Sequence, residues 1–425
     1  MSSVSVEAER PIVHNHRLPR VAWLVPAITV ALSAYVLLMP VWPIEKITGS
    51  YIDLQVYRLG VEAMLDGGDM YEELPPTTIG NKLPFIYPPF AALALGLFAF
   101  LPWSVAAPSF FVLSLAALAL TLYLVARRVW PQKSQRRMAV WATACAAPVA
   151  LLLEPVRENL DFGQVNLLLM ALVAADCLAH KPRWRRGMLV GIAAAIKLTP
   201  AAFVLYFLVR RDYRAAGTAA VSGTVATALA FVLLPSESIA YWFSGGGGAS
   251  SLSGSPFATN QSIQAVFARF QVPEFAFTGI WLTLGALLLA LSVAAMRRAA
   301  DLPALALAIN AVFTLLISPI SWSHHWVWIA PALFALVAYA TRLPRQRAVG
   351  WWALSAVATA VFVYGPHNWQ PADDSREFDW TPWQHIVGNT YVWFSVLLVV
   401  AYLVGGRRAT VSRRARLPSA PAASP

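Results

Sequence analysis

Long apolar runs are the feature that most constrains this chain. A helix of about 20 apolar residues can cross a lipid bilayer, where no water is available to unpaired backbone groups. Such runs recur between residues 21 and 405, and mostly short polar segments separate them. Only 12% of the residues are charged, whereas a soluble domain has about a quarter. The sequence therefore predicts an all-α integral membrane protein that crosses the bilayer many times.

Basic clusters between the apolar runs predict the orientation of the chain. Cytoplasmic loops are enriched in Lys and Arg, and such clusters occupy segments 127–137, 180–186, 210–214, 297–301, 341–347 and the tail from residue 405. Acids are enriched in segments 41–86 and 373–379, which we place outside. The net charge of +11 is distributed over many loops, so it gives no support for nucleic-acid binding.

One apolar run is too short to cross the bilayer. Segment 87–102 offers about fourteen apolar residues, and a crossing there would move the basic cluster 127–137 outside. We therefore predict a juxtamembrane or re-entrant helix in this segment. The remaining runs predict twelve spans, near residues 21–40, 104–126, 138–153, 163–179, 186–199, 200–210, 215–234, 277–296, 303–319, 326–341, 348–364 and 388–405.

The predicted organisation is a single transmembrane domain between two cytoplasmic tails. The tails cover residues 1–20 and 406–425, and the second is basic and of low complexity, which is typical of disorder. The transmembrane domain covers residues 21–405, with outer loops at 41–103 and 235–276.

No motif in the sequence predicts a metal or a cofactor. Cys145 and Cys177 lie inside apolar runs, where they resemble small core residues. Segment 244–255 is rich in Gly and Ser but lacks the lysine of a phosphate-binding loop, so it predicts a flexible connection. The adjacent pair His324–His325 has no acid or cysteine at metal-ligand spacing.

Polar residues gather at the predicted outer ends of the spans. They comprise Asp53 and the segments 81–89, 154–166, 196–200, 255–270 and 318–326. Ionisable groups at membrane depth are costly and usually line a cavity or pathway. We therefore predict a hydrophilic cavity that opens outward. No comparable cluster lies on the inner side, which favours an enzyme over a transporter because a transporter needs access from both sides.

Several of these residues also have purely structural interpretations. Ser50 and Asp53 have the spacing of a helix capping box. Lys197 lies near a span end and could extend to the interface, although Pro200 breaks the helix beside it. The histidine pair lies beside three tryptophans and could belong to an interfacial aromatic belt.

The remaining polar side chains allow two interpretations each. Gln164 and Asn166 could cap a helix or join neighbouring helices by hydrogen bonds. Arg157 and Arg269 could be loop charges or ligands of a phosphate. The sequence leaves both questions open.

An ordered set of motifs resembles a known family. An acid follows the first span, and then come YPP (87–89), GQVNLLLMALV (163–173), AAAIKLTPAAFVL (193–205) and NQSIQAVFAR (260–269). Together they resemble the polyprenyl-phosphate-mannose-dependent mannosyltransferases of mycobacteria, which are membrane glycosyltransferases of the GT-C fold. The resemblance covers roughly residues 20–400, and it is greatest to the α-1,2-mannosyltransferases that extend phosphatidylinositol mannosides.

The resemblance implies both substrates and the course of the reaction. The donor is polyprenyl-phosphate mannose at the outer leaflet, the acceptor is a glycolipid, and the anomeric carbon is inverted. The family's catalytic acid matches Asp53, which would act as the general base. Some eukaryotic relatives carry an acidic pair where this chain has a single Asp, so we predict no metal.

The predicted site combines this base with groups for the phosphate and the sugars. A polyprenyl phosphate is already a good leaving group, so the site needs positive charge and hydrogen-bond donors rather than a general acid. The candidate catalytic residues are Asp53, His324 and His325; the candidate donor or phosphate ligands are Lys197, Arg157, Arg269 and Tyr87; the candidate substrate ligands are Tyr57, Gln164, Asn166, Asn260 and Gln261.

Two alternative functions remain at this stage. An arabinofuranosyltransferase with a polyprenyl-phosphate arabinose donor would need the same base and the same phosphate contacts. A transporter or flippase for lipid-linked intermediates would instead need polar residues through the bilayer midplane.

Overall fold

The structure, a computed structural model, describes residues 18–38, 47–244 and 252–405. Within these ranges it is a helical bundle without β-strands, and only one isolated backbone bridge joins Asn260 to Trp322. The predicted all-α membrane fold is confirmed. Most of both predicted tails, and part of the Gly/Ser-rich segment 244–255, lie outside the described residues.

Within the described ranges, five helices are long and apolar enough to cross a membrane. They are η1 with α1 (Arg20–Leu38), α5 (Trp103–Val129), α11 (Tyr213–Leu233), α15 (Glu274–Arg298) and α18 (Arg345–Tyr364). Two bent pairs raise the number to as many as seven: α6 (Arg136–Ala150) with α7 (Glu154–Phe162), and α19 (Pro382–Gly388) with α20 (Thr390–Gly405). The predicted count of twelve spans is therefore not confirmed.

The other predicted spans are helical but short. They contain α8 (Asn166–Leu178), α9 (Met188–Ile196), η3 (Thr199–Phe203) with α10 (Val204–Val209), α16 (Pro303–Ile317), and α17 (Ile329–Ala340) after η4 (Ser323–Trp328). At 1.5 Å per residue, α8 with its 13 residues is roughly 20 Å long, which is less than the ~30 Å of a hydrocarbon core.

The short helix α8 ends level with α5 at one end of the bundle only. There, Arg128 near the C-terminus of α5 donates from Nε to the carbonyl of Leu178 (2.7 Å) at the C-terminus of α8. Since α5 has 27 residues, it extends well beyond Asn166 at the other end of α8. Asn166 therefore lies deeper in the bundle than the start of α5.

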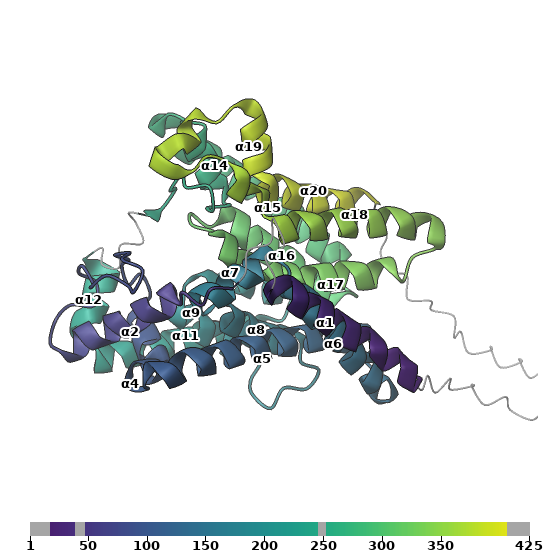
Figure 1. The fold of residues 1–425 in the computed structure, drawn as a ribbon, viewed down its shortest axis with the longest axis horizontal. Helices are drawn as coiled ribbons and strands as arrows, with labels where there is room; N and C mark the ends of the chain where they lie inside the picture. The colour runs from purple at the N-terminus through teal and green to yellow at the C-terminus, as the bar shows by residue number, and fades with distance from the viewer. Residues whose placement is uncertain (1–17, 39–46, 245–251, 406–425) are drawn as a thin grey trace, which may run out of the picture.

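Short helices gather at the end of the bundle where α5 begins. Figure 1 shows α2 (Ile52–Leu65), α4 (Leu97–Phe100) and α12 (Pro235–Phe243) at this end, and α14 (Ile263–Arg269) and α19 on its other side. We call this the α2 end. The other end contains Arg20 and Gly405.

Segment 87–102 forms two short helices rather than the one that we predicted. They are α3 (Pro89–Leu95) and α4. The carbonyls of Phe98 and Leu101 accept hydrogen bonds from Arg58 Nη1 (2.5 and 2.7 Å). These contacts tie the end of the segment to α2, and neither helix is long enough to span a bilayer.

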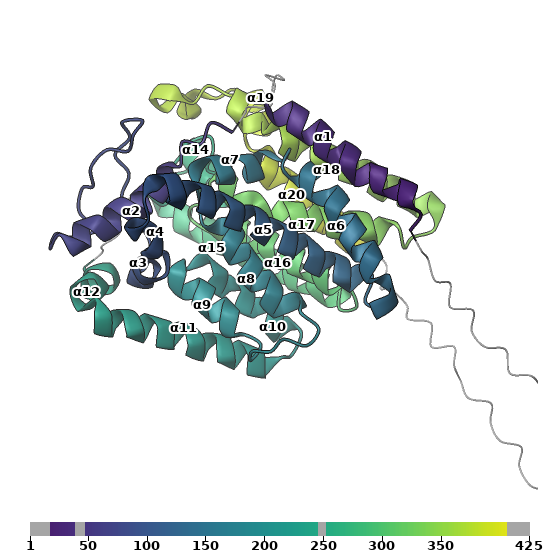
Figure 2. The ribbon, with the colours of Figure 1, turned by 60° about the horizontal axis from the view of Figure 1, so that its bottom comes forward.

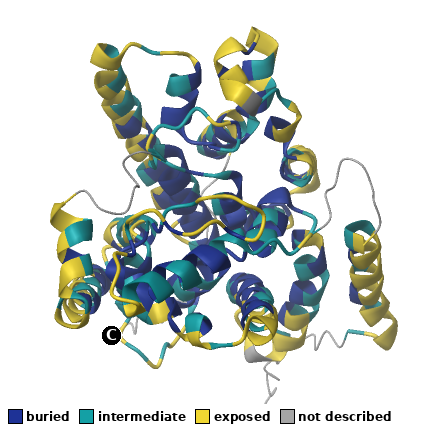
Figure 3. Ribbon diagram, turned by 60° about the vertical axis from the view of Figure 1, so that its left-hand side comes forward, coloured by how far each residue is buried: buried dark blue, intermediate teal, exposed yellow. Residues whose placement is uncertain are grey.

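The outward faces of the peripheral helices are apolar, as lipid contact requires. Leu24, Ile28 and Leu32 of α1 are all more than half exposed, and Val232 of α11 is 77% exposed. In Figure 3 the exposed residues cover the periphery and the buried ones fill the interior. An apolar surface of this kind belongs in a bilayer rather than in water.

Close packing of α9 on α11 depends on a glycine. The two helices lie side by side in Figure 2. A Cβ atom added to Gly191 would lie 2.7 Å from the Gly223 nitrogen and closer still to the Ala219 carbonyl. Since Lys197 follows α9 directly, this contact also fixes where Lys197 can lie.

We expect Gly191→Ala to destabilise the protein. The added methyl group would force α9 away from α11, at a cost of about 1–3 kcal/mol. The matched control is Gly217→Ala on α11, where a Cβ meets no atom within 4 Å and the free energy of unfolding should rise by up to about 1 kcal/mol. Thermal unfolding in detergent, followed by tryptophan fluorescence, distinguishes the two; equal melting temperatures would contradict the packing argument.

Candidate active site

Asp53 lies in the first turn of α2, partly exposed, at the α2 end of the bundle. The capping-box interpretation of Ser50 and Asp53 is wrong. The helix begins at Ile52, its N-cap residue is Tyr51, and no side chain caps it. Ser50 Oγ instead donates to the carboxylate of Asp161 (3.0 Å).

Gln164, which lies two residues before α8, contacts Asp53. Its Oε1 accepts hydrogen bonds from the hydroxyls of Tyr57 (2.6 Å) and Tyr87 (2.9 Å) and from the backbone nitrogen of Val165 (3.0 Å). These donors fix the orientation of the amide, which leaves its NH₂ group for the hydrogen bond to Asp53. The structure therefore brings the predicted residues Asp53, Tyr57, Tyr87 and Gln164 together.

Lys197 points into the bundle rather than toward the interface. It follows α9 in an extended conformation (φ −148°, ψ 129°). Its Nζ donates to Asn166 Oδ1 (2.9 Å), contacts His325 Nε2 (3.2 Å) and lies 5.3 Å from the centre of the Tyr87 ring. An ammonium group has no acceptor, so beside a protonated Lys197 the Nε2 atom of His325 must accept.

The environment of Asp53 makes its carboxylate more basic than usual. Burial raises the pKa of Asp53 to about 6, although the charge of Lys197 and the hydrogen bond from Gln164 lower it. Asp53 is therefore ionised at neutral pH, with a pKa near the range that suits a general base.

The two histidines of η4 have different surroundings. His325 is partly exposed and contacts Lys197, whereas His324 is only 8% exposed. The His324 ring packs edge-on against Phe162, with 5.3 Å between the ring centres, and its backbone carbonyl accepts from Asn166 Nδ2 (3.1 Å). Its Nε2 has no hydrogen-bond partner among the described residues.

Asn260 and Gln261 lie beside the segment that leads into η4, and both are fully buried. Asn260 Oδ1 accepts from the backbone nitrogen of Ser321 (2.9 Å). Gln261 Nε2 donates to the carbonyls of Ala258 (2.8 Å) and Gly388 (2.7 Å). These amides hold loops in place, and the structure does not bring them to Lys197.

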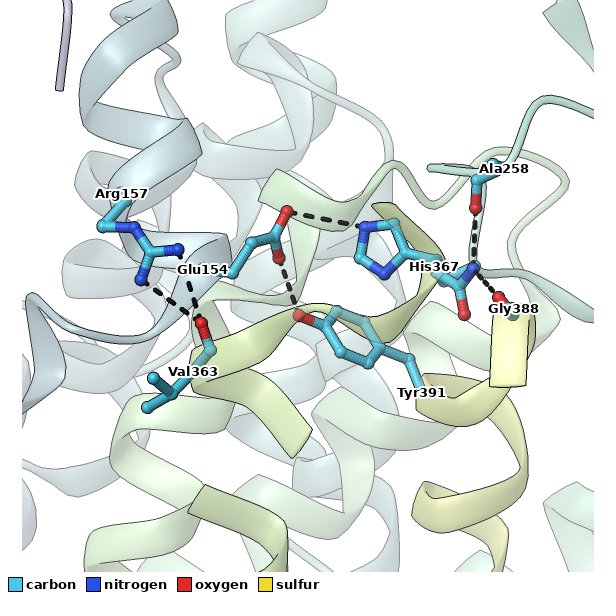
Figure 4. A network of polar contacts seen from close by, with 8 residues as sticks. Glu154, Arg157, Ala258, Val363, His367, Gly388 and Tyr391 are labelled. Carbon is cyan, nitrogen blue, oxygen red and sulfur yellow. Dashed lines mark hydrogen bonds and ion pairs between the residues drawn. The ribbon is translucent and has the colours of Figure 1, made fainter. Parts of the chain in front are cut away.

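The guanidinium groups of Arg269 and Arg157 bind protein acceptors. Arg269 is 1% exposed and donates to Asn389 Oδ1 and to three backbone carbonyls, those of Pro256, Phe257 and Asn260. Arg157 donates to the carbonyl of Val363 (3.4 Å) and thereby ties α7 to α18 (Figure 4).

The sequence analysis did not single out two acids of α7, Glu154 and Asp161, as candidate site residues. Glu154 accepts a hydrogen bond from the Tyr391 hydroxyl (2.7 Å) and lies 3.6 Å from His367 Nε2 (Figure 4). Asp161 binds the chain before α2. Both belong to the polar segment 154–166 that the sequence analysis singled out, but sequence alone does not tell which of its acids face which neighbours.

One hollow is lined by Lys197, and a second is lined by the next residue, Leu198. A cavity of about 40 Å³ is lined by Asn166, Lys197 and His325, among others. A groove of about 550 Å³ runs between α9, η3, α11 and α12, and its lining is mostly apolar. Leu198, next to Lys197 in the chain, belongs to this groove. No group of three or more potential metal ligands occurs in the described part of the chain.

The family model for glycosyltransferase family 87 matches residues 85–319, more than half of the chain. The chain belongs to glycosyltransferase family 87. The matched region contains Gln164, Asn166, Lys197 and the whole NQSIQAVFAR motif, and it ends just before the histidine pair.

The similarity to named relatives covers more of the chain than the family 87 model does. A Mycolicibacterium smegmatis protein, named polyprenol-phosphate-mannose-dependent alpha-(1-2)-phosphatidylinositol mannoside mannosyltransferase, is 38% identical over 84% of this chain and 85% of its own length. A Mycobacterium tuberculosis protein of the same name is 35% identical over 92% of this chain and 96% of its own length. The predicted resemblance and the predicted glycosyltransferase class are confirmed.

A solved structure is also similar to this family 87 chain. It is the crystal structure of ArnT from Cupriavidus metallidurans bound to undecaprenyl phosphate. The TM-score is 0.39 at 18% sequence identity, and the match covers 91% of this chain and 78% of that chain.

We expect the transfer rate of this family 87 enzyme to depend on pH through Asp53. If Asp53 is the general base, as the family resemblance implies, its pKa of about 6 means that it is protonated in acid, so kcat should fall below about pH 6 and stay level above it. Lys197→Met removes the charge that lowers this pKa, so the residual activity should fall at a higher pH. Initial rates across the pH range measure both; a fall near about pH 4 in both proteins would contradict the raised pKa of Asp53 and the influence of Lys197 on it.

Proposed function

We propose that this chain transfers mannose from polyprenyl-phosphate mannose to a phosphatidylinositol mannoside, forming an α-1,2 linkage with inversion. The names of the two mycobacterial relatives support the substrates. The observation that carries the proposal is that Asp53 and Lys197 share neighbours: Gln164 contacts Asp53 and accepts a hydrogen bond from Tyr87, and Lys197 Nζ lies 5.3 Å from the centre of the Tyr87 ring. This arrangement supports a base and a phosphate ligand in one site.

Asp53 acts as the general base of this transfer. It takes the proton of the acceptor hydroxyl while the hydroxyl oxygen attacks the anomeric carbon from the face opposite the phosphate. The bond between that carbon and the phosphate oxygen breaks, and the polyprenyl phosphate leaves with the electron pair. The leaving group needs no proton, so one carboxylate is sufficient.

Lys197 holds the phosphate of the donor. Its ammonium group has three N–H donors, of which Asn166 and His325 engage two. The third is available to a phosphate oxygen, and the positive charge stabilises the anion that forms as the bond breaks. Tyr57, Tyr87 and Gln164 surround Asp53, and the buried His324 holds Asn166 through its backbone carbonyl. Asn260, Gln261, Arg157 and Arg269 support the site as scaffold.

The apolar groove between α9 and α11 takes the polyprenyl chain. It is lined by Leu198, the residue after Lys197, by small and apolar side chains of α9 and α11, and by Trp242 and Phe243 of α12. A chain lying there would keep its phosphate at Lys197 and its isoprene units in contact with lipid.

We propose further that the α2 end faces the outside of the cell membrane. The positive-inside rule and the basic clusters between spans support cytoplasmic termini and a site that opens outward. In this arrangement residues 21–405 form one catalytic transmembrane domain between the two tails.

Filling the groove should weaken donor binding selectively. Ala228 of α11 lines the groove, whereas Val225 of the same helix does not and is 62% exposed. We expect Ala228→Trp to raise the KM for a long-chain donor about tenfold, since losing several buried CH₂ contacts costs more than 1 kcal/mol. A short-chain donor should be affected less, and Val225→Trp should leave both KM values unchanged. An equal effect on both donors would contradict the groove assignment.

The transfer assay tests the proposed function itself. Purified wild type should move mannose from polyprenyl-phosphate mannose to one member of a panel of phosphatidylinositol mannosides. Asp53→Asn should lower kcat by about 10²–10⁴ while the protein stays folded. The matched control, Asp66→Asn, changes an exposed acid at the other end of α2 and should keep full activity.

Three outcomes would overturn the proposal. Full transfer by Asp53→Asn would remove the base. Transfer from polyprenyl-phosphate arabinose but not from the mannose donor would assign the arabinofuranosyltransferase alternative. Movement of a lipid-linked sugar across vesicles without transfer would assign a transporter.

A further inference from the structure

The chain immediately before α2 is held by one residue of α7. The Asp161 carboxylate accepts hydrogen bonds from Gly49 N (2.8 Å), Thr48 Oγ1 (2.9 Å) and Ser50 Oγ (3.0 Å), and from the backbone nitrogen of Thr48. Its backbone carbonyl accepts from the nitrogen of Tyr51 (2.7 Å). Asp161 therefore binds each of the residues 48–51.

The conformation that these bonds enforce is an unusual one. Tyr51 lies in the left-handed region (φ +46°, ψ +35°), which bulky side chains rarely adopt. Such a conformation persists only where the surroundings determine it, and it is concentrated at functional sites. Gln55 closes the turn from the other side, because its Nε2 donates to the carbonyl of Ser50 (2.8 Å).

The end of α7 is shaped to fit this turn. Gly163 lies two residues after Asp161 and has φ +64°, and a Cβ there would lie 2.9 Å from Leu54 Cβ and 3.0 Å from Tyr51 Cδ1. The next residue is Gln164, whose amide contacts Asp53. Residues 161–164 therefore hold both the turn before Asp53 and the Asp53 side chain.

We propose that Asp161 is the positioning residue of the base. By binding residues 48–51 it fixes the rotation of the first turn of α2 and so the direction in which the Asp53 carboxylate points. Asp161 contacts no reacting atom in this account. The inference rests on the proposed function, because it assumes that Asp53 takes the proton.

The test compares Asp161→Ala with the conservative Asp161→Asn. The alanine variant loses all the side-chain bonds to residues 48–50, and misplacing a catalytic group by about 1 Å costs about a hundredfold in rate. We expect kcat to fall by about that factor, with the KM of either substrate changed less than about threefold and a shifted acid limb of the pH profile. Asparagine keeps an oxygen acceptor for Gly49 and should restore activity to within about tenfold of wild type.

The matched control is Asp176→Ala at the other end of α8. The Asp176 carboxylate likewise accepts from backbone nitrogens, those of Gly187 (2.9 Å) and Val190 (3.0 Å), and it is fully buried. This variant should lower the melting temperature but leave kcat per folded molecule and the pH profile unchanged.

Each result decides for or against the positioning role. Wild-type kcat and pH profile in Asp161→Ala would overturn it, as would a loss of stability alone like that of Asp176→Ala. If Asp161→Ala does not fold, the double variant Thr48→Val with Ser50→Ala removes only the hydroxyl donors; a lower kcat supports the proposal and an unchanged kcat overturns it. An active Asp53→Asn would instead refute the proposed function.

Discussion

Opposite charges that are only partly exposed are the constraint on which the rest of this structure depends. Asp53 and Lys197 lie within an apolar bundle, where each charge would be costly without the other. Their mutual influence keeps Asp53 ionised at neutral pH while burial keeps it basic. The surrounding amides and the neutral His325 complete the hydrogen bonding of both groups.

The short helices explain how such a pair can exist in a membrane protein. Because α8 begins only at Asn166 and α9 ends at Ile196, their ends meet below the level reached by α5. Backbone at this depth is tolerated where it lines a cavity. Leu198, the residue after Lys197, lines the apolar groove. In the proposed function, the lipid chain of the donor lies in this groove while its phosphate contacts Lys197.

The sequence predicted the class of fold and much of the site because both follow from strong signals. Apolar runs identify helices in a membrane, and Asp53, Gln164, Asn166, Lys197 and His325 are rare polar residues at their ends. The sequence could not show that Arg157 and Arg269 donate to backbone carbonyls. An arginine that binds a phosphate and one that binds the protein backbone are the same residue type, and only the fold shows which acceptors lie nearby. Tyr51 adopts a left-handed conformation, and α2 therefore begins at Ile52 without the predicted capping box. This conformation and the contacts of Asp161 depend on tertiary packing, which no local sequence pattern encodes.

The most direct measurement is a cryo-electron microscopy structure of Asp53→Asn with both substrates bound, since a slow variant retains them. The account predicts the acceptor hydroxyl oxygen within about 3 Å of the residue 53 side chain, on the face of the sugar opposite the phosphate, and the phosphate within hydrogen-bond distance of Lys197 Nζ. An acceptor hydroxyl remote from residue 53, or a phosphate bound at Arg157 or Arg269 instead, would contradict the account.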